Sequence, residues 1–184
     1  DLAAARISKA LAGNNVRVGE SFTGRGNLFA NTHGLITYEK MRLDELNLID
    51  QSITVATLSP YSVVSPGQLI ATIKIIPLAV PKKLLEMAEV VARIESPIIS
   101  ISPFERKNIG LIMSRLPGMK ESILEKTSET AAGRVEAYGS KITHEIRLGH
   151  DQEEVKEGIE KLVDNCDILL IFGASAVVDR QDVL

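Results

Sequence analysis

The chain has 184 residues, of which 45% are hydrophobic and 24% are charged, a composition that excludes a disordered or low-complexity protein. Its 21 Lys and Arg face 24 Asp and Glu, so the formal net charge is −3. This charge gives no general attraction to nucleic acid, and we expect no nucleic-acid partner. No apolar run approaches the roughly 20 residues that cross a bilayer, so we expect a soluble, cytoplasmic protein without a membrane partner. The single cysteine, Cys166, suits a reducing compartment.

The first part of the chain predicts a mixed α+β domain over residues 1–80. Ala-rich sequence predicts the first helix, which Gly13 ends, and alternating β-branched residues predict the strands. Pro66 and Gly67 predict a tight turn before the last strand. In chain order, the predicted elements are a helix over 2–12, loops and short strands over 16–37, a helix over 38–49, and strands over 52–58 and 68–76.

The second part predicts a parallel α/β domain. A helix over 82–93 is expected to connect the two parts, within a linking segment over 81–96. From residue 97 to 184 the pattern is βαβαβ, which is typical of a parallel sheet covered by helices. The predicted strands lie over 108–114, 141–147 and 167–172, and the helices over 119–138 and 152–163. We expect this domain to be truncated at its C-terminus, and the N-terminus to be cut as well.

Ligands of an open parallel sheet bind outside the carboxyl ends of its strands, so the residues that follow each strand are the candidate site. After the third strand, Gly173, Ala174 and Ser175 form a turn of small residues. Unpaired amides in such a turn, with the Ser175 hydroxyl, can bind phosphate. The alternative is a close-packed turn with Asp179 capping the next helix. The turn lacks both the Walker and the dinucleotide glycine patterns.

Further candidates surround this turn. Asp179 and Asp182 are spaced to share a magnesium ion with a phosphate, or else to complement the dipole of a helix. At the end of the first strand, Ser114 and Arg115 are candidate binding residues, and Arg115 and Arg180 are the candidate partners of phosphate.

Two residues have both a functional and a structural interpretation. Arg25, between two glycines, is either a phosphate ligand or a solvated turn residue. His150 is either an acid–base group or part of the start of the next helix, where Asp151 is the expected N-cap. No aromatic platform lies among basic residues in the sequence, which leaves single-strand nucleic-acid binding without support.

The segment over 167–183 resembles the molybdopterin-binding domain of molybdopterin adenylyltransferases and molybdotransferases. That superfamily has an apolar strand followed by Gly-Gly-x-Ser-x-Gly-Asp, and Gly173 and Asp179 match its first glycine and last aspartate. Residues 174–178 depart from the motif. Where the family has Thr-Gly-Asp-Glu-Leu, residues 114–118 read Ser-Arg-Leu-Pro-Gly and lack the carboxylate. The segments over 22–30 and 71–77 are similar to a divergent branch of the superfamily, some members of which are fused to a nucleotidyltransferase domain.

The resemblance implies a three-layer parallel-sheet domain that binds molybdopterin, or a nucleotide-linked form of it, in molybdenum cofactor biosynthesis. For an enzyme it implies metal insertion or nucleotidyl transfer, with Asp179 and Asp182 as catalytic residues holding magnesium. The alternatives are a non-catalytic cofactor carrier or regulatory module, and a scaffold without a ligand. The ligand would be a pterin phosphate, the partner a nucleotidyltransferase domain, and the assembly a homo-oligomer.

Overall fold

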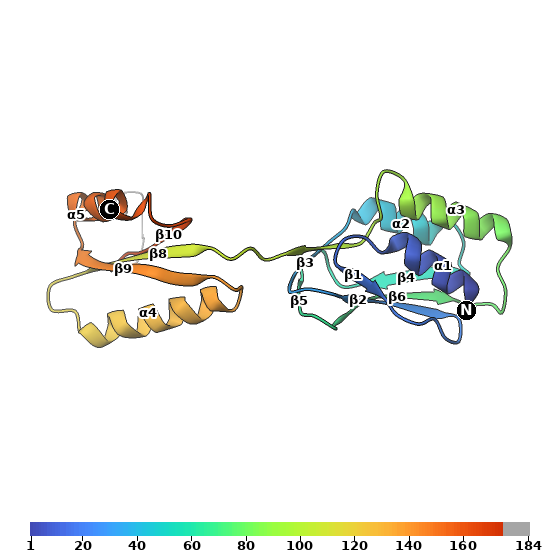
Figure 1. Ribbon diagram of the computed structural model, residues 1–184, viewed down its shortest axis with the longest axis horizontal. Coiled ribbons are helices and arrows are strands. Elements are labelled where there is room, and N and C mark those ends of the chain that lie inside the picture. Colours follow the sequence, from blue (N-terminus) through green and yellow to red (C-terminus); the bar gives the residue numbers. More distant parts are fainter. Residues whose placement is uncertain (175–184) are drawn as a thin grey trace. The chain divides into compact units, whose positions relative to one another are not determined.

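The computed structural model describes residues 1–174 (Figure 1), which fold into two compact units, one over Asp1–Phe104 and the other over the described residues from Glu105 onward. The helices are α1 (Leu2–Leu11), α2 (Lys40–Leu48), α3 (Lys82–Arg93), α4 (Glu121–Glu136) and α5 (Gln152–Leu162). The strands of the first unit are β1 (Val16–Val18), β2 (Arg25–Ala30), β3 (Gly34–Thr37), β4 (Ile53–Thr57), β5 (Val63–Val64), β6 (Leu69–Ile75) and β7 (Ser100–Pro103). The strands of the second unit are β8 (Asn108–Arg115), β9 (Lys141–Gly149) and β10 (Ile168–Phe172).

The first unit contains two antiparallel sheets, with strand orders β1-β2-β6-β4 and β5-β3-β7. Its core joins both sheets to α1, α2 and α3, and Leu11, Leu28, Leu46, Ile73 and Ala88 are fully buried within it. Burying each large aliphatic side chain contributes about 1.5–3 kcal/mol, so apolar packing holds this unit together.

The predicted turn before β6 is confirmed. The Gln68 amide donates to the Ser65 carbonyl oxygen over 3.0 Å, and Gly67 has a φ of +84°. A positive φ at this position is what glycine after proline supplies. The turn carries the chain from β5 in one sheet to β6 in the other.

The boundary between the units differs from the expected one. Instead of linking two domains, α3 packs into the first unit, where Leu85, Ala88 and Ala92 are buried. The strand β7, which the sequence did not predict, pairs antiparallel with β3 in the same unit. The first unit therefore extends to Phe104 because both elements find their partners there.

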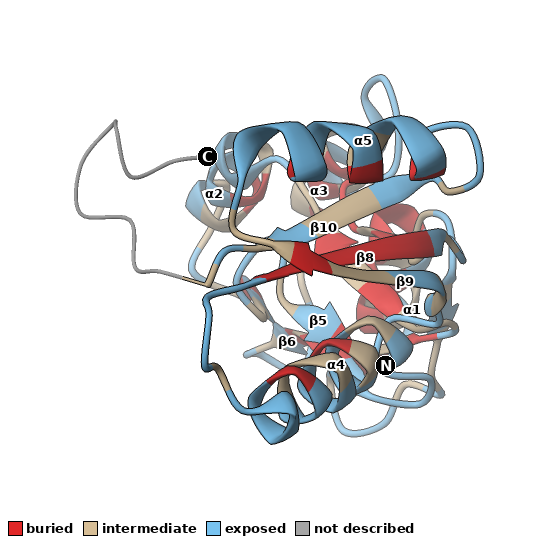
Figure 2. Cartoon of the chain, turned by 90° about the vertical axis from the view of Figure 1, so that its left-hand side faces the viewer, coloured by how far each residue is buried: buried red, intermediate tan, exposed pale blue. Residues whose placement is uncertain are grey.

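The second unit contains a parallel sheet, with strand order β10-β8-β9. The βαβαβ order predicted from the sequence is present. Side chains of α4 pack with Leu111 and Met113 of β8, and those of α5 pack with Ile112 of the same strand. Because successive strand residues face opposite sides, the two helices cover opposite faces of the sheet. Figure 2 shows β8 as the buried centre of this unit.

The structure thus confirms a mixed α/β chain, with one parallel and two antiparallel sheets within residues 1–174. None of the helices in this range combines the length and the apolar composition that crossing a bilayer requires.

The stability of the first unit should depend on pH through one ion pair between α1 and α3. Arg6 donates from Nε and Nη2 to the two Glu89 carboxylate oxygens, over 2.9 and 2.5 Å. The hydrogen bonds from Arg6 hold the pKa of Glu89 below its ordinary value of 4.5. The contribution is therefore present above the pKa of the unfolded chain and is lost as pH falls through the lowered pKa. We expect Glu89→Gln to reduce stability at pH 7 and to show a smaller deficit at pH 3, measured by urea unfolding. An equal deficit at both values would contradict this assignment.

Candidate functional site

A pocket of about 520 Å³ opens at the carboxyl ends of β8 and β9, where ligands of parallel sheets bind. Its lining comes from the loop after β8 and from the junction of β9 with α5. The lining residues are Arg115, Leu116, Pro117, Gly118, Met119, Gly149, His150, Asp151 and Glu154. The pocket therefore brings together the first two of the three strand ends that the sequence singled out.

A buried serine ties all three strand ends together. The Ser114 side chain is 1% exposed, and its Oγ accepts the amide hydrogen of Ala174 over 2.9 Å. The same Oγ lies 2.9 Å from His150 Nδ1. With Nδ1 unprotonated, the hydroxyl donates its own hydrogen to the ring and so satisfies both neighbours. Ser114 thus fixes the positions of His150 and of the start of the turn after β10.

Several main-chain amides at the strand ends are already occupied. Ala174 donates to Ser114, so its amide is not free for an anion, contrary to the sequence prediction. The Asp151 carboxylate accepts the amides of Glu153 and Glu154, which confirms the predicted N-cap of α5. Glu154 Oε2 accepts the amide of Gly149 over 2.6 Å. Protein carboxylates therefore take the place that an anionic ligand would have at the start of this helix.

Arg115 is the cation of the pocket. Its side chain is 56% exposed, and its guanidinium lies 3.9 Å from Glu121, an ion pair of loose geometry. Glu121 pairs more closely with Arg147, which also bonds Glu145 over 2.7 Å. Hydrogen bonds to Glu121 and Glu145 raise the pKa of Arg147 above its ordinary value. Since Arg147 is the main partner of Glu121, Arg115 can turn toward a bound anion at small cost.

The other predicted site residues lie in different places. Gly173 and Ala174 follow β10, with Ala174 held by Ser114. The remaining candidates lie outside the described residues, namely Ser175, Asp179, Arg180 and Asp182. The predicted magnesium ligands are among these, and residues 1–174 hold no cluster of three or more metal-ligating side chains. Arg25 begins β2 in the first unit.

Sequence reasoning missed the link between Ser114 and His150. The two residues are 36 positions apart, and only the parallel register, which pairs Ser114 with Leu148, places them side by side. The bond from the Gly149 amide to Glu154 was also missed, although the two residues are only five positions apart and the spacing of Glu154 from Asp151 had indicated a cap. The signal in the sequence that could have indicated these contacts is the presence of polar residues at the ends of adjacent strands.

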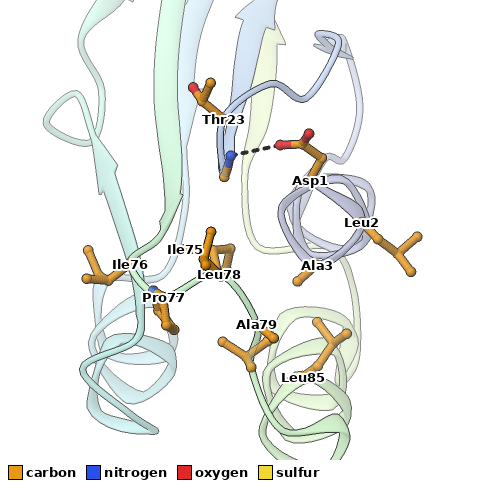
Figure 3. A pocket seen from close by; sticks show the side chains of 12 residues that line it. Asp1, Leu2, Ala3, Thr23, Ile75, Ile76, Pro77, Leu78, Ala79 and Leu85 are labelled. Atoms are coloured by element: carbon orange, nitrogen blue, oxygen red, sulfur yellow. Dashed lines mark hydrogen bonds between the residues drawn. The ribbon is translucent and has the colours of Figure 1, made fainter.

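A second cavity, of about 630 Å³, lies in the first unit between α1, the end of β6 and the start of α3 (Figure 3). Its lining is mainly apolar and includes Ile75, Leu78 and Leu85. The Asp1 carboxylate at its rim accepts the amide of Gly24 over 2.8 Å. With its carboxylate and without a cationic side chain in its lining, this cavity offers nothing to a phosphate.

The strand-end pocket is therefore a place where polar, cationic and main-chain groups converge at the carboxyl ends of parallel strands. Comparisons with protein-family models, with curated proteins and with solved structures gave no significant match to the chain.

Proposed function

We propose that the chain binds molybdopterin, or a nucleotide-linked form of it, at the strand-end pocket and acts in molybdenum cofactor biosynthesis. The observation that carries the proposal is the pocket at the carboxyl ends of β8 and β9, with Ser114 joining three strand ends beneath it. The family is proposed from the resemblance of the segments over 22–30, 71–77 and 167–183. The finer fold, a three-layer molybdopterin-binding-like domain, is part of this proposal.

The topology of the sheet supports a ligand at this place. From β8 the chain passes to β9 on one side, and it then returns to β10 on the other side of β8. In open α/β sheets, the reversal of strand order creates a crevice where small molecules bind. The pocket volume of about 520 Å³ is within the usual range for such sites.

The groups in the pocket fit the two ends of a pterin phosphate. Arg115 offers a guanidinium to the phosphate. Asp151 Oδ2 and Glu154 Oε1 accept no hydrogen bond from other residues in 1–174. These oxygens can accept from the amino and ring N–H groups of a pterin. When bound, molybdopterin supplies the ligands of molybdenum, while this chain's own residues orient the heterocycle and neutralise its anionic end.

A magnesium ion, if used, would be held by Asp179 and Asp182, and Gly173, Ser175 and Arg180 would complete the anionic end of the site. Catalysis of metal insertion or nucleotidyl transfer by the two aspartates is one form of the proposal. The second candidate is a non-catalytic carrier that passes its ligand to a nucleotidyltransferase domain or partner. The absence of a carboxylate in residues 114–118 favours the carrier.

Replacement of Arg115 tests the pocket. We expect Arg115→Gln to weaken molybdopterin binding by tenfold or more, since a charge-assisted hydrogen bond contributes roughly 1.5–3 kcal/mol. Anaerobic titration calorimetry of the protein with molybdopterin measures the change. The control is Arg134→Gln, an exposed arginine in the last turn of α4, which should leave the affinity unchanged. Equal affinities for the two variants would remove Arg115 from the site.

Turnover separates the two forms of the proposal. The full chain is incubated with molybdopterin, magnesium, molybdate and ATP or CTP, and the products are separated. Product that disappears in Asp179→Ala supports catalysis, whereas retention of unchanged molybdopterin supports the carrier. An Asp179→Ala variant with unaltered affinity would remove Asp179 from the binding site, and failure of the natural chain to bind molybdopterin would end the proposal.

A further inference from the structure

The outward face of the sheet β1-β2-β6-β4 gathers basic side chains from separate strands. The register pairs Arg25 of β2 with Lys74 of β6, and Lys74 with Thr54 of β4. Directly paired residues of antiparallel strands share a face, so these three side chains form one row, and all three residues are exposed. Along β2, the buried residues Gly26, Leu28 and Ala30 alternate with residues of the outward face and point toward the core.

Two aromatic side chains lie on the same face. Phe22 forms a bridge with Arg25 across the turn between β1 and β2 and is 75% exposed. Phe29 pairs with Arg17 of β1, and the Arg17 guanidinium lies 4.7 Å from the centre of the Phe29 ring. Two of the chain's four phenylalanines therefore lie among three basic side chains. We call these five residues the basic sheet face: Arg17, Phe22, Arg25, Phe29 and Lys74.

The strands of this face carry no acidic residue, although Glu20 lies in the turn between β1 and β2 and Asp1 accepts the amide of Gly24 beside Arg25. The strands β1, β2, β4 and β6 contain no Asp or Glu, and none of the three cations forms an ion pair with another residue in 1–174. The carboxylates of the unit lie mostly on α2, α3 and in loops. The outward face of this sheet is therefore basic, although the whole chain has a net charge of −3.

We propose that the basic sheet face binds single-stranded nucleic acid. Unpaired cations contact phosphates, and exposed rings or guanidinium planes stack with bases, which is the combination that sequence-tolerant strand binding uses. Asn27 and Thr72, hydrogen-bonded to each other over 3.0 Å on this face, add polar groups that can reach base edges. The aromatic platform that is absent from the linear sequence is assembled by strand pairing. This proposal is independent of molybdopterin binding, since it concerns a surface of the first unit alone.

Fluorescence anisotropy with a labelled twelve-nucleotide oligouridine tests the proposal on the full chain. Three phosphate contacts predict a slope of log affinity against log salt of about −2, because each contact to a single strand contributes about −0.7. The double variant Arg25→Gln with Lys74→Gln should reduce the slope to about −0.7. Phe22→Leu should weaken binding by about tenfold at constant charge, since stacking on one ring is lost.

The control is Lys82→Gln, an exposed lysine on α3 that pairs with Glu86, and its affinity and salt slope should match the natural chain. Circular dichroism confirms that each variant is folded. Absence of binding at low salt would overturn the proposal. If polyglutamate of equal charge competed as well as oligouridine, and Phe22→Leu had no effect, the face would be a docking surface for an acidic protein instead.

Discussion

Replacement of Gly34 by alanine should unfold or severely destabilise the first unit. A Cβ at this position would lie 2.1 Å from the Ser102 carbonyl oxygen and 2.8 Å from the Pro103 Cα. These are main-chain atoms of β7, which pairs with β3 at this point. The clash with the added Cβ can therefore be relieved only by breaking this strand pairing. We expect a loss of about 3 kcal/mol or more, at the upper end of overpacking effects. Because the chain has no tryptophan, urea unfolding followed by far-ultraviolet circular dichroism is the suitable measurement.

The matched control is Gly133→Ala. Gly133 lies in α4, and a Cβ there would meet nothing within 4 Å. Alanine should stabilise this helix by about 0.5–1 kcal/mol, since glycine costs that much in a helix interior. A Gly34→Ala variant as stable as the natural chain would show that β3 and β7 are not packed as described.

Replacement of Ser114 by alanine should have the largest effect at the candidate site. The change removes the acceptor of the Ala174 amide and the partner of His150 Nδ1. A buried polar group left unsatisfied costs about 1–3 kcal/mol, so the second unit should lose stability in that range. Because Ser114 joins the strand ends beneath the pocket, molybdopterin affinity should fall as well, although the serine is buried and does not line the pocket.

Ser122→Ala provides the comparison, since Ser122 is exposed on α4, and its stability and affinity should stay within about 0.5 kcal/mol of the natural chain. Both quantities are measured on each variant by urea unfolding and by calorimetry. Unchanged stability and affinity in Ser114→Ala would mean that the hydrogen bonds of Ser114 do not hold the strand ends.

Local signals were sufficient to predict most elements. The helix α3 has the bounds that its apolar spacing predicted, and Asp151 caps α5 as its place before Glu154 indicated. The order of strands and helices after Asn108 follows from periodicity. These features depend on residues within a few positions of one another, which is the range over which a single sequence is informative.

Features that depend on distant contacts were not predictable. The four-residue strand β7 exists because it pairs with β3, which is more than sixty positions away. Arg25 lies next to Lys74 only through the register of β2 with β6. The occupied amide of Ala174 depends on Ser114, sixty positions earlier. Each of these contacts forms because burial and strand pairing bring the segments together.

Mapping of amide chemical-shift changes by nuclear magnetic resonance, as molybdopterin is added to the isotope-labelled protein under anaerobic conditions, tests the central claim most directly. The account predicts that, within residues 1–174, the largest changes fall on the amides around the strand-end pocket, at Arg115, Gly118, Gly149 and His150. Changes concentrated instead between Ile75 and Val80, around the apolar cavity of the first unit, or the absence of any change, would contradict it.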